Sequence, residues 1–117
     1  MQLSVSRLDP SGVALATVDG EIDVYSAPTL RDGLTELLQQ GASVVVDLTE
    51  VGFLDSTGLG ALVAARKVAE DSGAQLPLVC TRERILKLFT ITGLDGVFTI
   101  HPSIDGAVAA LATGGTA

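Results

Sequence analysis

The sequence predicts a single α/β domain, in which an N-terminal β-hairpin is followed by alternating helices and strands. Two observations support this fold class. The chain has 117 residues, 47% of them hydrophobic, which suits one compact domain with one core. Short β-branched runs also alternate with longer segments whose apolar residues recur every three or four positions. Each strand–helix–strand unit forms a right-handed parallel crossover, so we expect a mixed sheet with helices packed on it.

The first elements are a hairpin and a helix. Residues 2–19 are predicted to form an antiparallel hairpin around DPSG, where Pro10 and Gly12 suit the second and fourth positions of a β-turn. Ser26 is the predicted cap of a helix that continues to about Gln40 and ends at Gly41. The residues expected to face the core are its leucines at helical spacing: Leu30, Leu34, Leu37 and Leu38.

Three further strands and three further helices are predicted. SVVVDL (43–48) and AQLPLVC (74–80) are typical of buried strands, although Pro77 lacks the amide that a sheet ladder needs, and VFTI (97–100) is a short last strand. The intervening helices are 59–71, stopped by Gly73, and 82–92, stopped by Gly93; a last helix spans 104–111. On the first of these helices one side carries Leu59, Leu62, Val63 and Arg66; on the second, the residues expected to face inward are Ile85, Leu88 and Phe89. We expect residues 1–112 to form the domain and 113–117 a flexible tail.

Composition excludes several classes of partner. The formal charge of −7 and the isoelectric point near 4.3 argue against nucleic-acid binding, which needs a basic surface. The start of the chain has no signal-peptide pattern and no apolar run reaches membrane-spanning length, so we expect a cytoplasmic protein that does not bind a membrane. The lone cysteine, Cys80, is expected to be a buried small apolar residue.

No catalytic, metal or cofactor site is predicted. The chain has no Gly-x-Ser-x-Gly motif, and its single histidine, His101, is far from any candidate nucleophile and is expected on a surface loop. It also lacks a P-loop and a full dinucleotide-binding fingerprint. We therefore expect a binding protein rather than an enzyme, without cofactors.

A phosphate-accepting loop is the strongest functional candidate, and it lies in FLDSTGLGAL. Function in α/β folds gathers at the carboxyl ends of the strands, where DGEIDVYS and TEVGFLDSTG lie. Asp47 superficially fits a phosphoaspartate, but the first strand is not followed by the acidic pair that would hold magnesium. Ser56 and Thr57 instead stand at a helix start, where backbone N–H groups and the helix dipole favour an anion. The structural alternative is that Asp55, Ser56 and Thr57 simply cap the helix.

Three segments resemble the STAS-domain anti-sigma-factor antagonists of bacteria. They are VDGEIDVYSAPTLRDGL, VVVDLTEVGFLDSTGLGAL and LFTITGLDGVFTI, and together they extend over most of the chain. The middle segment is highly specific, and the outer two would be weak alone. The resemblance implies a partner-switching protein that binds an anti-sigma factor with serine kinase activity and so releases the sigma factor. The kinase would switch the antagonist off by phosphorylation, and a serine phosphatase would restore it.

The resemblance also assigns roles to residues. Ser56 matches the phosphoacceptor, Thr57 is a candidate second acceptor, Asp55 is the adjacent acid, and Asp23 is the loop aspartate associated with partner docking. Asp55 and Thr57 are expected to contact the partner as well, together with Gly58. The helix that follows is also expected to be a docking face, because its small residues leave a smooth surface: Gly60, Ala61, Ala64 and Ala65. Asp23 alternatively only shapes the turn before the first helix. Two other functions remain open: a STAS-like scaffold in a larger signalling complex or beside an anion transporter, and a small-ligand-binding module.

Overall fold

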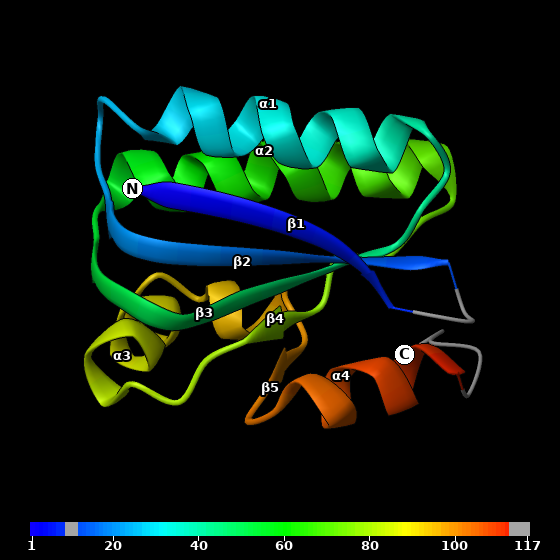
Figure 1. The fold of residues 1–117 in the computed structure, drawn as a ribbon. Coiled ribbons are helices and arrows are strands. Elements are labelled where there is room, and N and C mark those ends of the chain that lie inside the picture. The colour runs from blue at the N-terminus through cyan, green and yellow to red at the C-terminus, as the bar shows by residue number, and fades with distance from the viewer. Residues whose placement is uncertain (9–11, 113–117) are drawn as a thin grey trace.

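The computed structural model describes residues 1–8 and 12–112 as a twisted sheet with helices packed on it (Figure 1). The predicted turn at Pro10 and the predicted tail at 113–117 lie outside the described residues. The elements are, in chain order, β1 (Gln2–Leu8), β2 (Val13–Ile22), α1 (Ala27–Gln39), β3 (Val44–Leu54), α2 (Ser56–Ser72), β4 (Leu78–Val79), α3 (Glu83–Ile91), the 3₁₀ turn η1 (Leu94–Gly96), β5 (Ile100–His101) and α4 (Ile104–Ala112).

The strands lie in the sheet in the same order as in the chain, β1-β2-β3-β4-β5. β1 and β2 are antiparallel, and each later neighbour is parallel to the one before it. The hairpin, the mixed sheet and the α/β class are therefore confirmed. This arrangement brings the carboxyl ends of the parallel strands to one end of the sheet, where the loops to α1 and α2 begin.

The two faces of the sheet carry different helices. Val44 and Val46 belong to the main core together with buried residues of α1, α2 and α3, whereas Val45 packs with Ala107 of α4 on the opposite face. This division follows from the alternation of side chains along a strand. In Figure 1, α1 and α2 run alongside each other on one side of the strands, and α4 lies on the other.

β2 and β3 are longer than predicted. We expected β3 to end at residue 48 and TEVGFL to be a loop, but β3 continues to Leu54 because β2 continues to Ile22 and pairs with it. The register between the two strands shifts between Thr17 and Asp19 and again between Gly20 and Glu21. Gly20 has a φ of +95°, which a residue with a side chain rarely adopts. These irregularities break the alternation of apolar and polar residues that would have marked a strand.

The helices confirm most of the predicted core. Leu30, Leu34 and Leu38 of α1 are fully buried, and the helix ends before Gly41, which has a φ of +87°. The side of α2 that the sequence singled out is only partly buried: Leu59 and Leu62 are buried, whereas Val63 is 41% exposed. The buried residues of α2 are two leucines and four small residues: Leu59 and Leu62, with Gly58, Ala61, Ala65 and Ala69.

The last strands are short. β4 begins only after Pro77, whose carbonyl accepts a hydrogen bond from the Val46 N–H (2.9 Å). The last strand is Ile100–His101 rather than residues 97–100, because Phe98 turns into the core and meets Phe89 edge-on at a centroid distance of 5.9 Å. His101 therefore lies in β5 and not on a surface loop; its Nε2 atom is buried and lacks a hydrogen-bond partner among the described residues.

Candidate functional site

The two predicted functional loops meet at one end of the sheet. Glu21 pairs with Phe53 and Ile22 with Leu54 in the parallel register, so β2 and β3 end side by side. The Asp55 N–H then donates to the Ile22 carbonyl (3.3 Å), which joins the start of α2 to the loop that leads into α1. Asp23 and Ser56 are thus brought to the same end of the molecule by the pairing of strands that are distant in sequence.

Asp55 is the N-cap of α2. Its backbone is extended, and its Oδ1 atom accepts hydrogen bonds from the N–H groups of Thr57 (3.0 Å) and Gly58 (3.1 Å). The Thr57 hydroxyl donates to the same oxygen. Together these donors lower the pKa of the Asp55 carboxyl, the hydroxyl having the largest effect, so the side chain is an anion at neutral pH.

Ser56 is the first residue of α2 and is exposed. Within residues 1–8 and 12–112, no hydrogen bond engages its hydroxyl, which leaves Oγ accessible to a reagent from solvent. The cap is therefore Asp55, and Ser56 is not needed to satisfy the helix end. Because the Asp55 carboxylate occupies the Thr57 and Gly58 amides, the predicted anion site on those N–H groups is already filled by a side chain.

Small residues after Ser56 have two different roles. A Cβ at Gly58 would lie 2.5 Å from Leu54 Cδ1 and 2.7 Å from Ile22 Cγ2, so glycine lets the start of α2 approach the strand ends closely. Ala61 and Ala65, predicted as docking residues, are 6% and 0% exposed, so they present little surface to a partner in this structure. Gly60 is exposed and has open space where a Cβ would be, and Ala64 is half-buried, so these two residues still belong to the surface.

Asp23 organises the loop between β2 and α1. Its Oδ1 atom accepts hydrogen bonds from the N–H groups of Tyr25 (3.0 Å) and Ser26 (3.1 Å), and its carbonyl accepts from the Ala27 N–H (2.8 Å). Ser26 was predicted to cap α1, but its side chain makes no cap hydrogen bond; its Oγ instead accepts from the Asp23 N–H (2.9 Å). The structural role foreseen for Asp23 is therefore present, whatever its part in docking.

Two other residues considered in the sequence, Asp47 and Cys80, lie outside the two loops. Asp47 lies within β3, where its Oδ1 atom accepts from the N–H (3.0 Å) and the hydroxyl of Thr49. Cys80 is 3% exposed, as predicted, and burial raises the pKa of its thiol. Across the part of the chain that the structure describes, three or more potential metal ligands nowhere come together, and no helix is long and apolar enough to cross a membrane.

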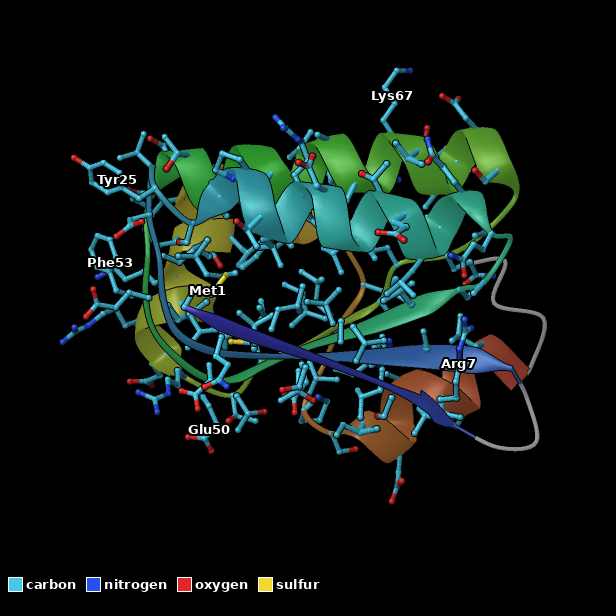
Figure 2. The ribbon with its side chains drawn as sticks, turned by 45° about the horizontal axis from the view of Figure 1, so that its top comes forward. Met1, Arg7, Tyr25, Glu50, Phe53 and Lys67 are labelled. Atoms are coloured by element: carbon cyan, nitrogen blue, oxygen red, sulfur yellow. The ribbon has the colours of Figure 1, made fainter. Side chains whose placement is uncertain are left out.

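Sequence reasoning missed two aromatic residues at this end of the sheet. Tyr25 is 89% exposed and Phe53 is 46% exposed, and Figure 2 shows both side chains directed outward from the same end of the molecule. The signal available in the sequence was weak. Tyr25 stands between acids and a helix start in DGEIDVYS, where a large aromatic ring has no predicted core to enter.

The fold and the site define a small α/β module that presents an accessible serine at a helix start. The STAS domain family model matches residues 7–107. An anti-sigma-B factor antagonist of Bacillus subtilis is 44% identical over 91 residues, which cover 78% of this chain and 84% of that protein. The chain therefore belongs to the STAS domain family and is similar to its anti-sigma-factor antagonists.

Solved structures agree with this assignment. An anti-sigma factor antagonist from Mycobacterium paratuberculosis is 29% identical, with a TM-score of 0.81 and 93% of each chain covered. The phosphorylated form of the Bacillus cell fate determinant SpoIIAA shares the fold at 17% identity, with a TM-score of 0.71 over 94% of this chain and 99% of that one. The predicted family and fold are confirmed.

Proposed function

We propose that this protein is an anti-sigma-factor antagonist that binds an anti-sigma factor with serine kinase activity, releases the sigma factor, and is switched off by phosphorylation of Ser56. One observation carries the proposal: Ser56 is exposed at the first position of α2, with its hydroxyl unengaged. The similarity to proteins named anti-sigma-B factor antagonist supports the partner class.

The phosphorylation step needs little from this chain. Ser56 Oγ attacks the γ-phosphorus of ATP held by the partner, the bond to the β-phosphate oxygen breaks, and ADP leaves. The serine proton passes to a base of the kinase, which also supplies magnesium. A serine phosphatase then hydrolyses the phosphoserine and restores the antagonist.

The phosphate would weaken partner binding through charge. It adds about −1.5 to −2 charges at pH 7, beside the Asp55 carboxylate, to a chain whose formal charge is already −7. Two amides at the helix start that could have bound it, those of Thr57 and Gly58, are engaged by Asp55. A partner surface matched to a neutral hydroxyl, with nucleotide phosphates close to Oγ, would repel this group, and every ~1.4 kcal/mol of repulsion lowers affinity about tenfold.

The test compares the wild type with Ser56→Ala and Ser56→Glu as baits in a lysate of the source organism. We expect the first two baits to retain an anti-sigma factor with a serine-kinase domain, Ser56→Glu to lose it, and mass spectrometry to find phosphate on wild-type Ser56. All three should unfold cooperatively, because Ser56 caps nothing. Equal retention by all three baits, without phosphate at Ser56 or Thr57, would instead favour a STAS-like scaffold or ligand-binding module.

A further inference from the structure

The aromatic residues of this chain are divided between the core and one end of the sheet. The sequence has three phenylalanines, one tyrosine and no tryptophan. Phe89 and Phe98 are 0% and 4% exposed and pack against each other, whereas Tyr25 and Phe53 are exposed beside the Ser56 loop. Val24 is also exposed, at 57%. We call Val24, Tyr25 and Phe53 the apolar end surface.

The apolar end surface is held on a preorganised backbone. Phe53 pairs with Glu21 in the β2–β3 register, and the Asp23 carboxylate fixes the backbone N–H of Tyr25 at 3.0 Å. An open hollow lined by Met1, Glu21 and Tyr25, among others, lies beside the ring. A large side chain that is exposed on an ordered turn loses little backbone entropy when it binds a partner, and tyrosine is enriched among residues that dominate binding energy.

The charged residues next to Val24, Tyr25 and Phe53 in the sequence are acids. Residues 19–30 and 47–65 contain none of the chain's seven lysines and arginines. They contain six of its 14 acids, and three of these, Glu21, Asp23 and Asp55, lie at the end of the sheet that carries the surface. A cation also lies beside β3: Arg82, the residue before α3, donates from Nε to the Thr49 carbonyl (3.0 Å). A partner that covers the surface must therefore offer apolar groups to the two rings and basic groups to the acids beside them.

From this arrangement we infer that Tyr25 and Phe53 anchor the anti-sigma factor, which presents an apolar cleft for the tyrosine ring with lysine or arginine side chains at its edge. The inference rests on the proposed function, because a kinase that phosphorylates Ser56 must cover this end of the sheet. Beyond that function, the inference identifies Tyr25 and Phe53 as the residues that supply affinity for the anti-sigma factor. Phosphorylation of Ser56 controls whether the partner binds. The apolar end surface contacts the partner both when it binds and when it phosphorylates Ser56.

The partner for the test is the kinase-domain protein that the wild type and Ser56→Ala retain and Ser56→Glu loses. This purified anti-sigma factor is titrated into each single variant, and calorimetry measures the affinity. We expect Tyr25→Ala to weaken binding at least about tenfold and Tyr25→Phe to bind nearly as the wild type, because the ring supplies the contact. Phe53→Ala should weaken binding as well. Ile91→Ala is the matched control, since Ile91 is 70% exposed at the end of α3, and it should bind as the wild type.

The outcomes separate this inference from the proposed function. Suppose that Ser56→Glu abolishes binding while Tyr25→Ala and Phe53→Ala bind as tightly as Ile91→Ala. The phosphorylation switch is then supported, and the anchoring role of Tyr25 and Phe53 is excluded. If Tyr25→Ala instead abolishes self-association in sedimentation experiments with unchanged affinity for the anti-sigma factor, the surface joins two copies of this chain and the inference fails. Affinity should also fall with rising salt, and salt-independent binding would contradict the basic edge proposed for the partner.

Discussion

The Thr57 hydroxyl donates to Asp55 Oδ1, the same oxygen that accepts the backbone N–H groups of Thr57 and Gly58. Two of the three polar residues in Asp55-Ser56-Thr57 are therefore engaged with each other across Ser56, which is left exposed between them. The acid and the threonine shape the helix start, and the serine is available for reaction.

Phosphate should appear on Ser56 and not on Thr57. The Thr57 hydroxyl is held against Asp55, so transfer to it would require that bond to break and would place the new charge against a carboxylate. We expect the cognate kinase to leave Ser56→Ala unmodified and to phosphorylate Thr57→Val at Ser56, as mapped by mass spectrometry. Phosphothreonine in Ser56→Ala would restore Thr57 as a second acceptor.

Removal of the Asp55 side chain should destabilise the domain. Asp55→Ala leaves the Thr57 and Gly58 amides without their acceptor, which should lower the free energy of unfolding. Urea denaturation followed by circular dichroism measures the change. Asp71→Ala is the control, because Asp71 is an exposed acid near the C-terminus of the same helix, where a negative charge is unfavourable. An equal loss in both variants would show that the cap is not the cause.

The contribution of Asp55 should disappear in acid. Its pKa is lower in the folded than in the unfolded state, so the stabilisation is fully present above the unfolded value, about 3.9, and is lost as pH falls through the folded value. We expect the free energy of unfolding of the wild type to exceed that of Asp55→Asn at pH 7 and the difference to shrink below about pH 4. A difference that stayed constant on acidification would exclude the carboxylate as its source.

Gly58 and Gly60 should respond oppositely to alanine. At Gly58 the new Cβ would collide with Leu54 and Ile22, and such overpacking costs about 1–3 kcal/mol. At Gly60 there is open space in the same helix, so Gly60→Ala should stabilise the protein by about 0.5–1 kcal/mol. Thermal and urea denaturation of both variants provide the comparison. A stable Gly58→Ala would mean that the helix start is not packed tightly on the strand ends.

The features that follow local rules were predictable. Gly41 and Gly73 end α1 and α2 as the sequence predicts, and the leucine stripe of α1 enters the core at Leu30, Leu34 and Leu38. The serine at the start of α2 was also located correctly. Each of these features depends on residues within a few positions of one another, so a single pattern in the chain is enough to indicate it.

Other features were missed because they depend on residues distant in sequence. The continuation of β3 to Leu54 exists only because β2 continues past two register shifts beside it. Ala61 and Ala65 are buried while Val63 is 41% exposed, and which side of α2 is covered depends on the segments that pack against this helix.

By itself, the sequence determined the order of elements, the apolar stripes, the helix ends and the loop that carries Ser56, because helix periodicity and turn chemistry are local. The tertiary structure alone decided that Asp55 rather than Ser56 caps α2, that Asp23 lies at the same end of the sheet, and that Tyr25 stays exposed beside it. The physical reason is that hydrogen-bond partners and burial are fixed by which segments pack together. Here the parallel pairing of β2 with β3 sets that arrangement.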